Sequence, residues 1–182
     1  MEFKELIEAR RSVRKYAAAE LTKAEVEAIV TEALEAPSWK NREPTRYHVI
    51  LDAALKECLR TQAMPEGNAA KCVNAAALVA VTFKKGLSGF TLQSDGTNTP
   101  DNELGDMWGA YDAGLASAYF MLAARNRGWD SLVIGIRDAA KAVEVLGLPA
   151  DETLTAIIVL GKGDQSMPKP PRKPAADVAT VR

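Results

Sequence analysis

The segment that most constrains the fold of this chain is an apolar stretch over residues 109–127, in which small side chains dominate. Its small positions are Gly109, Ala110, Ala113, Gly114, Ala116, Ser117 and Ala118, and its larger apolar ones are Leu115, Tyr119, Phe120, Met121 and Leu122. A helix that is apolar nearly all round must be buried on all sides. The segment therefore predicts a central helix, which packs either within the core of its own chain or against a partner subunit.

Helices and strands are predicted to alternate along the chain, with no repeats and no long linker. Thr22 and Glu25 fit a capping box, Pro37 stops the helix that follows, and Asp138 can cap a later one. The expected helices span 3–10, 22–37, 53–61, 68–74, 109–127 and 138–146, and the expected strands span 47–51, 76–83, 129–136 and 154–160. This alternation is typical of α/β or α+β proteins.

The composition excludes several classes of function. The chain has 182 residues, which suits one domain over 1–182, and its net charge of −1 lacks the basic excess of a dedicated nucleic-acid binder. Two cysteines and one histidine are too few for a structural zinc site built from those residues. The histidine, His48, lies in an apolar run that favours a strand over a catalytic base. The charged N-terminus is not a signal peptide and 109–124 is too short to cross a bilayer, so we expect a cytoplasmic protein.

Two segments differ in composition from their surroundings. Residues 84–106 are rich in Gly, Ser, Thr, Asn and Asp, and a loop this long in a compact domain is usually a lid or a mobile segment. A disordered surface loop would explain this composition equally well. From residue 161 onward, basic residues alternate with prolines, which predicts an extended basic C-terminal arm over 161–182.

Two polar clusters in the first quarter of the chain are candidate binding sites. The first comprises Arg10, Arg11, Ser12 and Arg14, whose forked guanidinium donors and hydroxyl suit phosphate oxygens. Most such runs are solvated surface, so this cluster alone is weak evidence. The second is the proline-bounded turn over 36–44, where Pro37, Ser38 and Asn41 could present hydrogen bonds to a planar polar ligand or simply link a helix to a strand.

Three further clusters are candidate binding sites, and each of them alone is also weak evidence. Asn68 and Lys71 share one helix face and could grip a ring carbonyl or lie on the surface. At Ile134 and Gly135 a turn could bring bare backbone N–H groups close to a ligand. The basic arm carries Arg172 and Lys173, and it could also be a frayed tail.

The order of these clusters resembles the nitroreductase family of flavoproteins over nearly the whole chain. The family's Arg-x-Ser-x-Arg motif is matched from Arg10 to Arg14, and its Ala-Pro-Ser-x-x-Asn-x-x-Pro turn is matched over 36–44. Other matches are the strand that ends at Ile134 and Gly135 before Asp138, Leu-Gly-Leu-Pro at 146–149, and, more loosely, the basic tail. Three positions depart from the pattern: Glu43 replaces a common Gln, Thr45 an aromatic residue, and Ile134 the Glu of larger members.

The resemblance implies an α+β fold, a three-layer α/β/α sandwich around a mostly antiparallel sheet, in an intertwined homodimer with two FMN sites at the interface. Arg10 and Ser12, with Arg11 beside them and Arg172 or Lys173 from the arm, would hold the FMN phosphate. Arg14 would reach the ribityl or pyrimidine side of the flavin. The other subunit would supply Pro37, Ser38 and Asn41, and the flavin ring would lie near Asn68, Lys71 and the backbone N–H groups of Ile134 and Gly135.

The implied activity is that of an NAD(P)H-dependent oxidoreductase. Hydride would pass from NAD(P)H through flavin N5 to a small organic acceptor, such as a nitroaromatic or a quinone, by ping-pong turnover, with Lys71 or Arg14 stabilising charge on the reduced flavin. The aromatic residues Trp39, Phe90, Trp108 and Tyr111 would shape the acceptor pocket or only pack. No catalytic side chain, metal, nucleic acid or membrane partner is expected. The alternatives are a flavin-binding sensor or carrier without turnover, and a phosphate-ligand binder without flavin.

Overall fold

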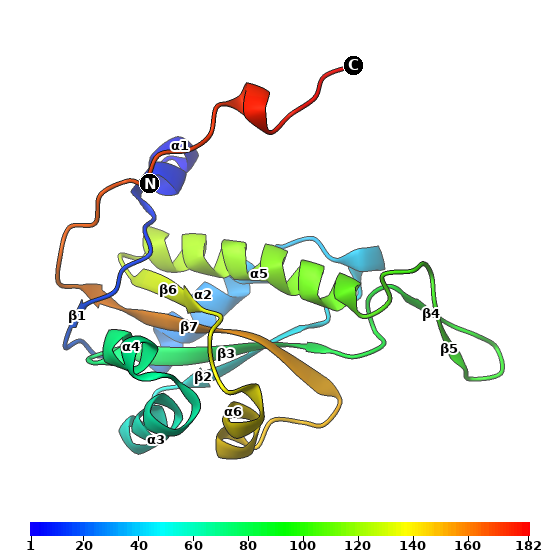
Figure 1. The fold of residues 1–182 in the computed structure, drawn as a ribbon, viewed down its shortest axis with the longest axis horizontal. Helices are drawn as coiled ribbons and strands as arrows, with labels where there is room; N and C mark the ends of the chain where they lie inside the picture. The colour runs from blue at the N-terminus through cyan, green and yellow to red at the C-terminus, as the bar shows by residue number, and fades with distance from the viewer.

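The computed structural model describes residues 1–182 as helices around a sheet (Figure 1). The helices are α1 (Phe3–Ala9), α2 (Lys23–Ala33), α3 (Ala53–Ala63), α4 (Glu66–Ala69), α5 (Met107–Asn126) and α6 (Ala139–Leu146), with 3-10 turns at Trp39–Asn41, Ala70–Cys72 and Ala175–Asp177. The strands are β1 (Tyr16–Ala17), β2 (Thr45–Ile50), β3 (Ala77–Lys84), β4 (Phe90–Leu92), β5 (Asn98–Pro100), β6 (Asp130–Ile134) and β7 (Glu152–Gly163).

The main sheet is built around β7, the longest strand. β3, β6 and β1 all pair with β7, β2 pairs with β3, and every one of these pairings is antiparallel. A single parallel bridge joins Ser12 to Ser131 of β6, just after α1. The predicted α+β class with a mostly antiparallel sheet is confirmed.

Helices cover both faces of this sheet, so the predicted three-layer arrangement is also confirmed (Figure 1). Alternate side chains of β7 point to opposite faces. Ile157 and Val159 belong to the core under α3 and α6, whereas Ile158 and Leu160 belong to the core under α2 and α5. β3 is buried along almost its whole length because both of its faces and both of its edges are covered.

The apolar helix α5 lies on the sheet, but it is not buried on all sides as its composition predicts. Gly109 faces β3, where a Cβ would come within 2.3 Å of the Phe83 ring, so only glycine allows this approach. On the opposite face, a stripe at one-turn spacings is exposed; we call it the α5 stripe, and it consists of Met107, Tyr111, Gly114 and Ala118. No helix in the chain combines the length and the apolar composition needed to span a membrane.

The segment over 84–106 contains regular structure that its composition did not predict. β4 and β5 form a small two-stranded antiparallel hairpin within it. This hairpin projects from the end of the molecule where α5 begins (Figure 1). The base of the hairpin packs on α5, because a Cβ at Gly89 would lie 2.7 Å from the Trp108 side chain.

Several predicted boundaries are shifted. The helix expected to reach Pro37 ends at Ala33, since the residue before a proline is disfavoured in helical conformation. The helix expected over 68–74 begins after Pro65 and ends as a 3-10 turn at Cys72, before Asn74 with its positive φ. The last strand continues to Gly163 because its final residues pair with β1, so the C-terminal arm starts at residue 164 instead of 161.

Helix α1 and the C-terminal arm stand off the layered body, and the arm passes beside α1 before it runs on to the C-terminus (Figure 1). α1 buries none of its residues, and Phe3 is 70% exposed. The arm after β7 is exposed along nearly all its length, and Lys169 on it lies 4.0 Å from Glu8 of α1.

Candidate functional site

The first predicted cluster and the C-terminal arm meet in one cavity, which we call the arginine cavity. It has a volume of about 220 Å³. Its lining residues come from the segment after α1 and from the arm: Arg10, Arg11, Ser12, Arg14, Met167, Pro168, Pro170 and Arg172. Lys173, the alternative to Arg172 at the sequence level, is not among them.

The charge of the arginine cavity is uncompensated. No acidic side chain lines it, and none of its four arginines forms a salt bridge. Burial lowers the pKa of Arg10, and the neighbouring positive charges of Arg172 and Arg11 lower it further. Like charges crowded in a partly enclosed space favour binding of an anion, and the planar fork of arginine matches phosphate oxygens.

The chain before β1 is held in place by the sheet. The Val13 N–H donates to the Ser131 carbonyl at 3.0 Å, and the Tyr16 hydroxyl donates to the Val13 carbonyl at 2.8 Å. Val13 and Tyr16 are both buried. Their neighbours Ser12 and Arg14 are therefore held against β6 by residues anchored to the sheet, as a preformed binding site requires.

Strand β6 leads from this anchor to the third and fourth predicted clusters. The strand ends at Ile134, whose side chain is buried, while Gly135 is exposed and a Cβ there would meet nothing within 4 Å. Asn68 donates from Nδ2 to the Ile136 carbonyl at 2.8 Å and accepts from Lys71 Nζ at 2.9 Å. The structure therefore brings these two clusters together at one turn, with its backbone open to solvent.

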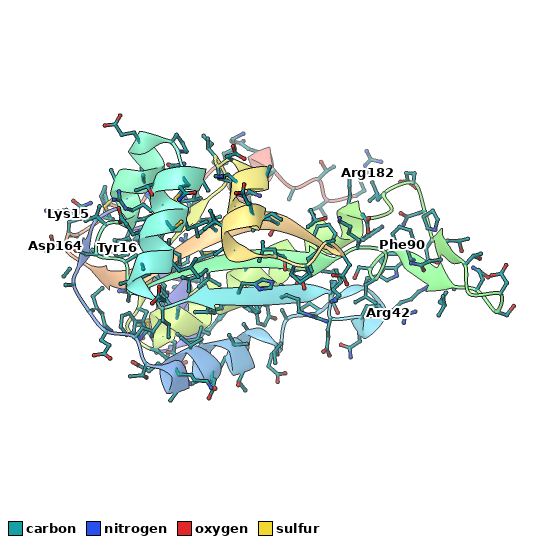
Figure 2. The ribbon with its side chains drawn as sticks, turned by 90° about the horizontal axis from the view of Figure 1, so that it is seen from below. Lys15, Tyr16, Arg42, Phe90, Asp164 and Arg182 are labelled. Carbon is teal, nitrogen blue, oxygen red and sulfur yellow. The ribbon has the colours of Figure 1, made fainter.

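The turn over 36–44 lies at the other end of the molecule. Figure 2 shows Arg42 of this turn at one end of the long axis, and Lys15, next to the arginine cluster, at the opposite end. Lys40, Asn41 and Glu43 all have positive φ, which is uncommon for such residues and often marks functional sites. The Glu43 N–H donates to Ser38 Oγ at 2.9 Å, closing the turn. Pro37, Ser38 and Asn41 thus lie far from the arginine cavity of their own chain.

The histidine and the buried cysteine, Cys72, are not arranged for nucleophilic catalysis. His48 Nε2 lies 2.6 Å from Glu152 Oε2, and the Thr82 hydroxyl donates to the same oxygen at 2.5 Å. This cluster joins three neighbouring strands within the sheet. Burial raises the pKa of the Cys72 thiol to about 11, so its thiolate is scarce near neutral pH.

Comparison with known proteins identifies the family. A family model described as the nitroreductase family matches residues 7–162, a span that runs from the end of α1 through β7. The chain belongs to the nitroreductase family.

Members of known structure share this fold. A nitroreductase family protein from Streptococcus pneumoniae TIGR4 superposes with a TM-score of 0.81 at 19% identity, covering 100% of both chains. A candidate nitroreductase from Exiguobacterium sibiricum 255-15, solved in complex with FMN, has a TM-score of 0.79 at 25% identity, covering 100% of this chain and 98% of that one. A protein of Archaeoglobus fulgidus, named as a candidate NADH dehydrogenase/NAD(P)H nitroreductase, is 28% identical over 160 residues, which is 86% of this chain and 82% of that protein.

Two polar residues of this nitroreductase family chain were missed at the sequence level. Arg137 donates to the Gly135 carbonyl at 2.6 Å and to the Leu154 carbonyl of β7 at 2.7 Å, which fixes the open turn. Asp112 is buried in α5 and accepts hydrogen bonds from two other segments. A lone carboxylate in a segment of apolar and small residues was a usable signal for Asp112, whereas nothing in the sequence marks Arg137.

Proposed function

We propose that the chain is an FMN-dependent oxidoreductase that takes electrons from NAD(P)H and passes them to a small organic acceptor. The observation that carries this proposal is the arginine cavity, which joins Arg10, Ser12 and Arg172 without any carboxylate. The Exiguobacterium relative is in complex with FMN, and the Archaeoglobus relative is named for NAD(P)H. Membership of the family and these two names support the assignment.

The residues present fit the groups of FMN. The arginine cavity offers guanidinium forks and the Ser12 hydroxyl to a phosphate, while Asn68, Lys71 and the Gly135 backbone would face the flavin ring at the far end of β6. From residue 131 to residue 135 an extended strand advances about 13 Å. This separation suits a ligand whose phosphate and ring are joined by a ribityl chain.

Bound FMN would supply the hydride chemistry. The chain would bind the cofactor, place positive charge near it and control the access of substrates to it. Lys71 and Arg14 form no ion pair, so their positive charges remain available to an anionic ligand. Arg137 holds the Gly135 carbonyl and so helps to fix the conformation of this open turn. No side chain of the chain is required as a nucleophile.

A second copy of the chain would complete each site. Pro37, Ser38 and Asn41 lie at the opposite end of the molecule from the arginine cavity, so in an intertwined homodimer they would serve the cofactor of the partner (Figure 2). The exposed α5 stripe, the unburied α1 and the free arm are the apolar and extended surfaces that such a dimer would cover.

The aromatic residues in and near the turn over 36–44 would shape the acceptor pocket. The rings of Trp39 and Trp108 are 4.5 Å apart, those of Trp108 and Tyr111 are 5.5 Å apart, and Tyr111 is 60% exposed. An exposed ring supported by packed ones offers a flat surface to a nitroaromatic or a quinone. We therefore include such planar acceptors in the proposed function.

The decisive experiment is a visible absorption spectrum of the purified protein after incubation with FMN and gel filtration. The flavin bands should remain with the protein and bleach under anaerobic NADH or NADPH much faster than free FMN does. A protein that retains no flavin would refute the proposal. Retained flavin that neither nicotinamide reduces would contradict the oxidoreductase activity and leave a flavin carrier or sensor.

A further inference from the structure

A buried carboxylate on α5 ties together two segments that lie far apart in the sequence. Asp112 is 3% exposed, and its Oδ2 accepts from the Trp39 N–H at 3.0 Å and from the Ser88 hydroxyl at 2.6 Å. Trp39 belongs to the turn over 36–44. Ser88, which is also buried, lies near the start of residues 86–101, which contain β4 and β5 and which we call the hairpin segment. One side chain thus fixes both segments to the same helix.

A second set of contacts joins the same two segments at the surface. Lys40 of the turn pairs with Asp101 of the hairpin segment at 2.9 Å and donates to the Thr91 hydroxyl at 3.2 Å. Thr91 in turn donates to the other oxygen of Asp101 at 2.6 Å. The hydrogen bond from the Thr91 hydroxyl, followed by the Lys40 ammonium, holds the pKa of Asp101 below its ordinary value. The turn and the hairpin therefore form one unit on the first turns of α5.

We propose that Asp112 is a positioning residue for the cofactor site of the partner subunit. It fixes the strained turn over 36–44, with its left-handed Lys40 and Asn41, in the conformation that presents Ser38 and Asn41 across the dimer interface. Through Ser88 it also sets the hairpin segment at the edge of the same site. This inference rests on the proposed function, because it needs FMN at the arginine cavity and the turn supplied in trans.

The two hydrogen bonds at position 112 favour a carboxylate over an amide. A main-chain N–H and a hydroxyl both point to one oxygen of Asp112, and a buried anion accepts such bonds more strongly than a neutral group. An amide at position 112 would keep the shape but weaken both bonds. Alanine would leave the Trp39 N–H without its partner and release the turn to relax from its positive φ angles.

The first test measures FMN affinity by fluorescence quenching for Asp112→Asn and Asp112→Ala. Both variants should bind FMN more weakly, by about tenfold or more for alanine, and the amide should be less affected. Asp106→Asn is the matched control, because Asp106, the N-cap residue of the same helix, accepts from the Gly86 N–H of the hairpin segment at 2.6 Å but has no bond to the turn. An Asp112→Asn chain with unchanged FMN affinity would overturn the proposal, even if Asp112→Ala fails to fold.

The second test separates a role in trans from a merely structural one. Arg10→Ala and Asp112→Ala chains, or Asp112→Asn if alanine prevents folding, are co-expressed with different tags and purified as mixed dimers. One site of the mixed dimer then combines an intact arginine cavity with an intact turn, so it should bind one FMN per dimer with unmodified affinity. Two weakened sites would mean that Asp112 acts within its own subunit, which refutes the proposal.

The same set of proteins shows which claim has failed. An Arg10→Ala homodimer that still binds FMN tightly would contradict the arginine cavity and hence the proposed function. An Arg10→Ala homodimer that loses FMN, beside an Asp112 variant that keeps it, would contradict only the role of Asp112.

Discussion

Removal of Arg10 should affect ligand binding and stability in opposite ways. In the ligand-free protein Arg10 is partly buried and its pKa is lowered by burial and by the charges of Arg172 and Arg11. Truncation of this side chain relieves repulsion between like charges, so Arg10→Ala should leave the stability of the ligand-free protein unchanged or slightly raised. If Arg10 had an ordinary structural role, its removal would instead lower the stability of the ligand-free protein.

The expected loss of FMN affinity follows from charge-assisted hydrogen bonds to the phosphate. Each such contact contributes about 1.5–3 kcal/mol, so Arg10→Ala should raise the Kd for FMN roughly 10-fold to 150-fold. At an FMN concentration of 100 times the original Kd, the ligand stabilises the protein by about 2.7 kcal/mol. A 100-fold weaker variant under the same conditions would keep only about 0.4 kcal/mol of that stabilisation.

The assay is thermal and chemical unfolding with and without FMN, in a buffer free of phosphate and sulfate because these anions would occupy the arginine cavity. Arg172→Ala and the double variant complete a cycle, and contact with one shared phosphate predicts non-additive losses. Arg60→Ala is the control, since Arg60 on α3 pairs with Glu57 outside the cavity. Equal FMN affinity for Arg10→Ala and Arg60→Ala would refute the assignment of the cavity.

Three further predictions concern the fold and the assembly. Gly109→Ala should destabilise the protein by about 1–3 kcal/mol through overpacking, whereas Gly67→Ala, where a Cβ meets nothing within 4 Å, should not; equal unfolding midpoints would contradict the close approach. Burial raises the pKa of Glu152, but hydrogen bonds from Thr82 and His48 together outweigh it and hold this pKa below its ordinary value. The stability from Glu152 is therefore present above pH 4.5 and is lost as pH falls further, so Glu152→Gln should flatten the acid limb of a pH-dependent unfolding curve, and an unchanged limb would be evidence against the pairing. Light scattering should give twice the chain mass of 19.6 kDa, and Ala118→Glu on the α5 stripe should shift it toward a monomer; a dimer insensitive to this charge would place the interface elsewhere.

The parts of the fold that were predictable are those that short-range patterns dictate. Thr22 and Asp138 begin their helices as capping residues, and the apolar run over 76–83 became the buried strand β3. The strand β1 could not be predicted, because two residues form a strand only when another strand is already there to pair with them. The hairpin at β4 and β5 was hidden for a similar reason: its polar composition is that of a loop, and contacts with α5 and the turn over 36–44 determine its place.

In the candidate site, too, residues within one short segment could be grouped from the sequence, whereas contacts between distant segments could not. Arg172 could be grouped with Arg10 and Ser12 only through the resemblance, since more than 150 positions separate it from them and no local pattern brings the arm back to α1. Asp112 was missed although it is a lone carboxylate in an apolar segment, and its partners Trp39 and Ser88 depend on how distant segments fold onto α5. Arg137 is bound by main-chain carbonyls, which every residue carries, so the sequence holds no sign of its partners.

A site shared between two subunits makes cofactor binding and dimer formation a single coupled equilibrium. One chain holds the arginine cavity at one end and the turn over 36–44 at the other (Figure 2). In the proposed dimer a monomer would therefore offer FMN only part of its contacts. FMN would then bind the dimer more tightly, and by reciprocity it would strengthen the dimer by the same factor. A tenfold preference at each of two sites would lower the dimer dissociation constant about 100-fold at saturating FMN. Sedimentation of a dilution series with and without FMN measures this shift, which should vanish in Arg10→Ala, and a chain that binds FMN with no change in dimer dissociation would show that each site is complete within one subunit.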